Sequence, residues 1–150
     1  MIRLRLLSLA WLLLALTLAP GRSGAAPAAM PPDEAPFWTG TPDSAAFEAR
    51  LHRRLELARA SIASMLAAKA PRTIANTLVP YDEALRQLDM AGSQASLAEN
   101  VLPDRATRNA GEKLSQEVAA YFTELSLNRK VYDALAALDV SKADPATRFY

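Results

Sequence analysis

The chain has 150 residues, enough for one domain but too few for a multidomain enzyme. Apolar residues make up 51% of it and only 5 residues are glycine, which excludes collagen-like and wholly disordered chains. It has no cysteine and a single histidine, His52. This composition excludes disulfides, thiolate zinc sites, cysteine nucleophiles and any metal site that needs two imidazoles from this chain.

The first 25 residues have the pattern of a secretory signal peptide. Two arginines precede an apolar run from residue 6 to residue 19, and proline, glycine and small residues follow. Small side chains favour cleavage after Ala25, with Ala28 as the second choice. The apolar run of about 14 residues is short for a membrane span, which needs roughly 20. An uncleaved anchor is the competing interpretation.

Cleavage after residue 25 would change the charge of the chain. It leaves 125 residues and lowers the net charge from +1 to −2, because three arginines and no acidic residue are removed. A slightly acidic chain lacks the positive charge with which nucleic-acid-binding proteins neutralise phosphates. The sequence therefore predicts an exported protein, periplasmic or secreted, with no nucleic-acid partner and no stable membrane anchor.

Residues 26–42 contain five prolines and one glycine. Proline fixes φ and removes a hydrogen-bond donor, so we expect this segment to be an extended leader rather than part of a helix. Phe37 and Trp38 are suited to anchor the leader on a neighbouring surface, either in this chain or in a part that is missing from it.

The first helix is expected over residues 44–69 and ends before Pro71. Thr41 or Ser44 is the expected N-cap, and Asp43 favours the positive end of the helix dipole. Apolar residues recur at steps of three and four and form one stripe along this helix. The stripe consists of Phe47, Leu51, Leu55, Ala58, Ile62, Met65 and Leu66.

The second helix is expected to start at Thr73 or Thr77 and to end before Pro103. Pro80 is tolerated near the start if Thr77 is the cap, but it would kink the helix if the cap is Thr73. Gly92 either weakens this helix locally or lets another backbone come close. Its expected apolar face comprises Tyr81, Leu85, Leu88, Ala95 and Leu102.

A third helix is expected from about Asp104 to Leu125, and Asn128 then caps a short fourth helix that runs to Leu138. The third helix has its apolar stripe at Ala106, Ala110, Leu114, Val118, Tyr121 or Phe122, and Leu125. Asp144-Pro145 starts another helix just before the last residue of the sequence. We interpret this late start as a sign that the natural polypeptide continues.

These patterns predict an all-α fold, an antiparallel helical bundle or set of hairpins over residues 43–150. No alternating apolar and polar run follows the leader, so no strands are expected. Amphipathic helices of this length bury their stripes fully only against a partner layer, and an incomplete lobe leaves an apolar patch exposed. We therefore expect the processed chain, expressed alone, to be helical but loosely packed or self-associating.

Two groups of side chains have residue types that could form a binding site. Glu48, His52 and Glu56 lie four residues apart on one face of the first helix, where they either hold a divalent cation or form a solvated polar face. Arg53 and Arg54 are adjacent, so the solvated face is the preferred interpretation.

Tyr121, Phe122 and Tyr132 form a ligand-facing aromatic group or, more often for aromatics at helical spacing, pack into the core. The chain has no glycine-rich phosphate loop and no HExxH motif, and one histidine on a distant helix is a poor basis for a nucleophilic triad. The sequence therefore predicts no catalytic, cofactor-binding or metal-ligating residue in this chain.

Residues 73–150 resemble the N-terminal helical region of the thimet oligopeptidase/oligopeptidase A family of zinc metallopeptidases. The resemblance begins at Thr73-Ile74-Ala75-Asn76-Thr77-Leu78, which is similar to a T-x-x-N-T-hydrophobic helix start in that family. It continues in the segments 107–115 and 124–135, and residues 146–150 match the start of the next family helix. Order and spacing agree over about half of the chain.

The resemblance implies a mostly helical enzyme with a deep channel between two lobes. Such enzymes hold one zinc ion through HExxH and a downstream glutamate, and a zinc-activated water cleaves short peptides. The N-terminal helices form one wall of the channel. Because no position of this chain matches the zinc motif, the resemblance implies the inactive leading part of an exported metalloendopeptidase, with short peptides as substrates and a missing C-terminal catalytic lobe as partner.

Two other hypotheses stay open on the sequence alone. One is a self-contained periplasmic helical bundle that acts as a binding or adaptor protein through its apolar stripes. The other is a metal carrier built around Glu48, His52 and Glu56.

Overall fold

A computed structural model describes residues 43–148, so the predictions of a signal peptide and a proline-rich leader lie outside the described residues. The all-α prediction is confirmed: in this part of the chain the regular elements are all helices, without a strand. The elements are α1 (Ser44–Ala67), the π-helix η1 (Ile74–Leu78), α2 (Val79–Val101), α3 (Arg105–Ser126), α4 (Arg129–Ala136) and α5 (Pro145–Arg148).

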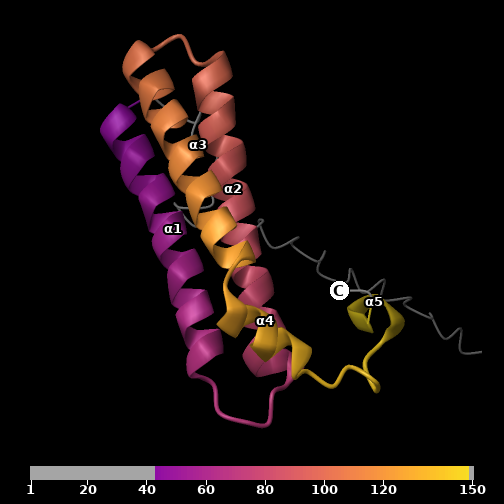
Figure 1. The fold of residues 1–150 in the computed structure, drawn as a ribbon. Coiled ribbons are helices and arrows are strands. Elements are labelled where there is room, and N and C mark those ends of the chain that lie inside the picture. The colour runs from indigo at the N-terminus through magenta and orange to yellow at the C-terminus, as the bar shows by residue number, and fades with distance from the viewer. Residues whose placement is uncertain (1–42, 149–150) are drawn as a thin grey trace, which may run out of the picture. The chain divides into compact units, whose positions relative to one another are not determined.

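Helices α1, α2 and α3 form an antiparallel three-helix bundle (Figure 1). Helix α2 packs extensively against both α1 and α3, and α1 also contacts α3. The short helix α4 folds back at the end of α3 and contacts α1 and η1. None of the described helices is long and apolar enough to cross a membrane.

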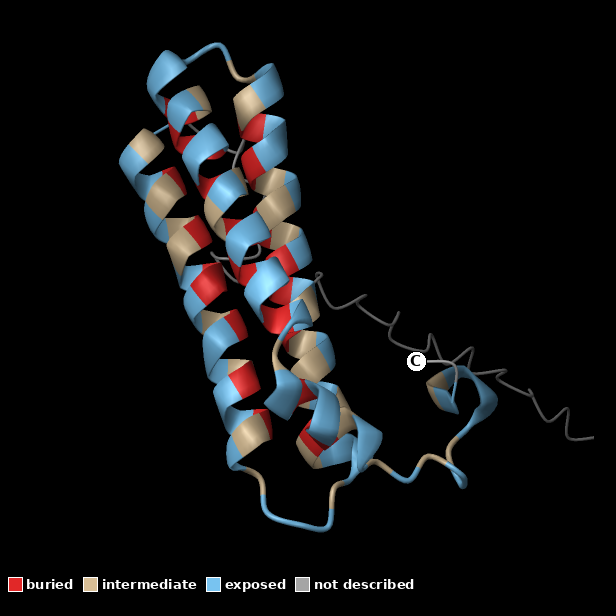
Figure 2. Ribbon diagram, in the orientation of Figure 1, coloured by how far each residue is buried: buried red, intermediate tan, exposed pale blue. Residues whose placement is uncertain are grey.

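The core runs along the bundle axis, where the inward faces of the three long helices meet (Figure 2). Six of the seven residues predicted for the stripe of α1 are buried, and Leu66 is packed at the edge. In α3, Tyr121 rather than Phe122 enters the core, while Ala106 is exposed and its neighbour Thr107 is buried. The helical period thus predicted most of the core correctly, but it missed Thr107 at the start of α3 and the buried Ala84, Ala91 and Ala98 within α2.

The face of α2 that meets its neighbours consists largely of alanines, which bring the helix backbones close together. Ala84, Ala91, Ala95 and Ala98 are all fully buried. The closest approach occurs at Gly111 of α3, where a Cβ would lie 2.7 Å from the main-chain oxygen of Ala95. The close approach suggested for Gly92 is much looser, since a Cβ there would lie 3.4 Å from Cγ1 of Val118.

The start of α1 differs in one detail from the sequence prediction. Asp43, and not Thr41 or Ser44, is the N-cap: its backbone is extended, and its carboxylate accepts hydrogen bonds from the N–H groups of Ala45 and Ala46. A carboxylate satisfies these orphan amides and also interacts favourably with the positive end of the helix dipole. Ser44 is instead the first helical residue.

Thr73 caps the second helical segment, which is the case for which a kink at Pro80 was expected, and a π-helical turn precedes Pro80. The segment begins with the π-helix η1, in which the N–H of Val79 donates to the carbonyl of Ile74. In a regular α-helix the ring of Pro80 would crowd the carbonyl of Asn76, and proline has no N–H to donate to it. The wider π turn places Pro80 at the start of α2, where both features are tolerated.

The later helix starts follow the sequence prediction. Asp104 caps α3 through the N–H of Thr107, and Asn128 caps α4 through the N–H groups of Lys130 and Val131. Helix α4 ends at Ala136, two residues earlier than expected. Asp144 accepts hydrogen bonds from the N–H and the hydroxyl of Thr147 at the start of α5.

Candidate functional site

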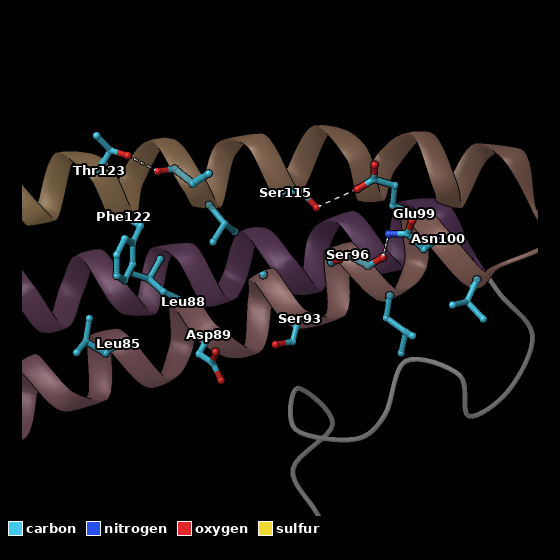
Figure 3. A pocket seen from close by; sticks show the side chains of 15 residues that line it. Leu85, Leu88, Asp89, Ser93, Ser96, Glu99, Asn100, Ser115, Phe122 and Thr123 are labelled. Carbon is cyan, nitrogen blue, oxygen red and sulfur yellow. Dashed lines mark hydrogen bonds between the residues drawn. The ribbon is translucent and has the colours of Figure 1, made fainter.

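An open groove of about 1080 Å³ lies between α2 and α3. Only these two helices line it, so it lies on the side of the bundle that α1 does not cover. Figure 3 shows the groove from close by, with Phe122 of α3 beside Leu88 and with Leu85 on the opposite wall. The groove extends along α2 as far as Val101.

The groove is apolar along its length and polar at intervals along its rim. Phe122 is 51% exposed, Leu97 41% and Val101 65%, although all three are large apolar side chains. Gly92 opens the middle of the groove because it has no side chain between α2 and Val118. An elongated apolar surface of this kind is suited to bind an extended chain or a helix rather than a small polar substrate.

The polar groups at the rim form local hydrogen bonds. The hydroxyl of Ser115 donates to Glu99 over 3.4 Å, and the side-chain amide of Asn100 donates to the carbonyl of Ser96 over 2.8 Å. Neither histidine nor lysine lines the groove, and Glu99 is the carboxylate beside Ser115. The apolar lining is the feature that suits this groove to binding.

The metal site considered for Glu48, His52 and Glu56 does not form. The Nε2 of His52 lies 3.2 Å from a carboxylate oxygen of Glu117 on α3, which Lys113 also approaches, and Glu56 lies 3.9 Å from Arg53. Within residues 43–148, no three histidine or carboxylate side chains come together as a metal would require. Helix packing has turned His52 towards α3, which the spacing within one helix does not reveal.

The three aromatic residues considered as one group are also separated. Tyr121 is buried in the core, and the guanidinium of Arg59 lies 4.4 Å from its ring centroid. Phe122 lines the groove, whereas Tyr132 on α4 is exposed and lies beneath Arg129. Burial raises the pKa of the Tyr121 phenol, which keeps it neutral in the core.

The structure contains a buried polar network that the sequence analysis did not predict. Arg54, assigned to a solvated face, is only 1% exposed and donates from Nη1 to Oε1 of Gln87 on α2 over 3.0 Å. Gln87 in turn donates to Glu83 over 2.8 Å, and Arg86 forms two hydrogen bonds with the same carboxylate. The hydrogen bond from Arg86 holds the pKa of Glu83 below its ordinary value, with Gln87 acting in the same direction.

A signal for this network was present in the helical period. Arg54 lies three residues after Leu51 and four residues before Ala58, at the edge of the apolar stripe. A long side chain at such a position can bury its stem and reach a polar partner. The network links α1 to α2 and fixes their register, which makes it a structural feature rather than a reactive one.

The chain was compared with protein-family models, curated proteins and solved structures, and no significant match was found in any of the three.

Proposed function

We propose that this chain is the N-terminal helical part of an exported zinc-dependent oligopeptidase that hydrolyses short peptides, and that it is inactive without the catalytic lobe. The observation that carries the proposal is that the family-like segments fall in helices or at their ends. The T-x-x-N-T segment begins at the cap of η1, and residues 107–115 lie in the first half of α3. Residues 124–135 include the end of α3 and most of α4, and residues 146–148 lie in α5.

The chemistry of the first of these segments supports the proposal. Thr73 and Asn76 form a reciprocal capping box, and Asn76 also donates to the carbonyl of Pro71 over 3.1 Å. The hydroxyl of the fully buried Thr77 donates to Oδ1 of Asn76 over 2.8 Å. Each of the three polar residues of the motif therefore forms hydrogen bonds that shape this helix start. A fortuitous similarity of sequence would not require all three to do so.

Exposed apolar side chains at the α4 end of the bundle give a second support. Leu127 is 79% exposed and Tyr132 63% exposed, and Ile74 lies near the same end. Large apolar side chains that gather at one end of a helical layer are typical of a surface that another part of the polypeptide covers. A following lobe would cover them.

The residues of this chain do not fit a zinc site. The sequence has no HExxH motif, and its described part brings together no group of three histidine or carboxylate ligands. Zinc and its ligands would belong to the catalytic lobe, and we assign no catalytic step to the residues described here. The role proposed for α1–α3 is to form a wall that restricts access to short, unfolded peptides.

The test is to read the intact gene beyond the Tyr150 codon and to purify the encoded protein. We expect an HExxH motif downstream and hydrolysis of short peptides that a zinc chelator abolishes and added zinc restores. A stop codon directly after Tyr150, or a continuing frame without a zinc motif, would overturn the proposal.

A self-contained exported binding or adaptor protein is the second candidate, and the open groove between α2 and α3 favours it. This candidate requires the reading frame to end with the described helices. It also requires binding of an extended apolar peptide that is insensitive to chelators and is lost when Phe122 is replaced by aspartate.

A further inference from the structure

We propose that the groove between α2 and α3 is the docking site of the chain's own leader, with Phe37 and Trp38 as the anchors. The inference does not depend on the peptidase proposal. It assigns one occupant to the groove, namely the segment that directly precedes α1, and it rests on the position of the groove, the reach of the chain and the composition of the leader.

The groove and the start of α1 lie at the same end of the bundle. Arg54 of α1 is hydrogen-bonded to Gln87 of α2, and the two helices are antiparallel. Counting ten residues from each partner places Ser44 about level with Leu97, which lines the groove. The leader therefore joins the bundle at the level of the part of the groove that contains Leu97 and Val101.

The chain is long enough to reach the groove from that point. Trp38 lies five positions before the N-cap Asp43, and at about 3.4 Å per extended residue these five steps span roughly 17 Å. Packed helices lie about 8–10 Å apart, so this length suffices to pass the end of one helix and enter the groove beyond it. Gly40 lies within this stretch and allows a change of direction.

A second groove on the bundle is out of reach of the same anchors. It lies between α1 and α2, has a volume of about 760 Å³ and is lined on α1 by Leu57 and the residues that follow it. Leu57 is fourteen residues into the helix from Asp43, which is about 21 Å at 1.5 Å per residue. The geometry thus distinguishes between the two grooves and favours the one between α2 and α3.

The composition of the leader suits an apolar groove. Its prolines fix φ in the range of polyproline II, which lowers the entropy lost on docking. Phe37 and Trp38 are the two largest apolar side chains between residues 26 and 42. Because the segment is covalently attached, its effective concentration at the groove is in the range of about 1 mM, so two aromatic anchors are sufficient.

Trp38 provides a direct readout of docking. The chain has two tryptophans, and Trp11→Phe leaves Trp38 as the single one in the full chain. We expect its fluorescence emission to be shifted to the blue, and its quenching by acrylamide to be roughly threefold weaker than in a free peptide of residues 26–43, because the indole is shielded from solvent. Leu97→Asp, in the part of the groove that is level with the start of α1, should raise the quenching to the level of the peptide.

The matched control is Ile74→Asp, which changes an aliphatic side chain of similar exposure in η1, outside the groove. This variant should leave the quenching of Trp38 unchanged. Circular dichroism of both variants verifies that the helices persist. Quenching equal to that of the free peptide in the parent chain, or an equal effect of both substitutions, would overturn the inference.

Cross-linking identifies the occupant independently, because the chain contains no cysteine. With Thr39→Cys and Ser96→Cys, mild oxidation should give a disulfide within one chain, since Ser96 lines the groove near the start of α1. Thr39→Cys with Ser64→Cys, in the second groove, should give none. A disulfide that forms mainly between two chains, or with equal yield in both pairs, would show a different occupant and overturn the inference. Confirmation would also remove the free surface that the second candidate function needs.

Discussion

A side chain on Gly111 of α3 would place its Cβ 2.7 Å from the carbonyl oxygen of Ala95 on α2, and 2.8 Å from the N–H nitrogen of Glu99. Both neighbours are main-chain atoms of a helix, which cannot rotate away as a flexible side chain can. The close approach of α2 and α3 at this point therefore requires a residue without a side chain.

We expect Gly111→Ala to lower the free energy of unfolding by about 1–3 kcal/mol, because the overpacked helices must move apart. Gly92→Ala in α2 is the matched control. A Cβ there would lie 3.4 Å from Cγ1 of Val118, at ordinary contact distance, so the higher helix propensity of alanine should leave the stability unchanged or raise it by up to about 1 kcal/mol. Urea denaturation of the three proteins measures both effects, and equal stability of the two variants would contradict the packing argument.

Arg54→Met should lower the free energy of unfolding by about 1–3 kcal/mol, because it removes the charged donor from Gln87 while retaining an apolar stem. The double variant Arg54→Met/Gln87→Leu should regain part of this loss, since both polar partners are then replaced. A double-mutant cycle by denaturation measures the coupling. Arg53→Met, on the exposed neighbour, is the control and should change the stability by less than about 0.5 kcal/mol. Strict additivity of the two core substitutions would argue against a network.

The N-cap carboxylate of Asp104 predicts a loss of stability in acid. Hydrogen bonds from the hydroxyl and then from the N–H of Thr107 lower the pKa of Asp104 below its ordinary value. A lowered pKa in the folded state means that the stabilisation is fully present above the unfolded pKa of about 3.9 and is lost as the pH falls through the folded value.

Asp104→Asn retains a neutral cap and cannot titrate. Melting temperatures of the parent chain and of this variant, measured from pH 7 to pH 2, should therefore differ most above pH 4 and converge in stronger acid. A difference that stays constant over the whole range would show that the charge of Asp104 does not contribute.

Asn76→Ala should destabilise the chain by about 1–2 kcal/mol, because it removes the capping box at Thr73 and leaves the buried hydroxyl of Thr77 without its acceptor. Asn109→Ala is the control on the exposed face of α3. It should leave the stability unchanged or raise it by about 0.5 kcal/mol through helix propensity. Thermal melts followed by circular dichroism compare the two, and equal effects would remove the special role of Asn76.

The signal-peptide prediction is tested by mass spectrometry of the protein after expression in a two-membraned bacterium. We expect a periplasmic product whose first residue is Ala26, because small residues precede that bond. Ala25→Arg should block this cleavage or move it to the bond after Ala28. An intact N-terminus at the membrane in the parent chain would instead establish the uncleaved anchor.

Much of the fold was predictable because helices are local structures. Period, caps and prolines lie close together in the sequence, so the three long helices and the α4 start at Asn128 follow from it, and so do most core residues, such as Leu51 and Leu114. The same locality explains the errors at helix ends. Asp43 or a neighbour becomes the N-cap according to which of them has an extended backbone. Whether the helix responds to Pro80 with a kink or with a π turn depends on how η1 packs.

What the sequence determined by itself is the class of the fold, the order of its helices and most of the core residues, since these depend on residue types and spacings within single segments. Only the tertiary structure decided that Arg54 is buried, that His52 is turned to Glu117 and that Phe122 lines a groove while Tyr121 fills the core. The physical reason is that each of these outcomes depends on which neighbouring helix a side chain meets. The neighbouring helix that each side chain meets is fixed by the close contact at Gly111 and by the register of α1 on α2. Neither of these can be read from the residue pattern of a single helix.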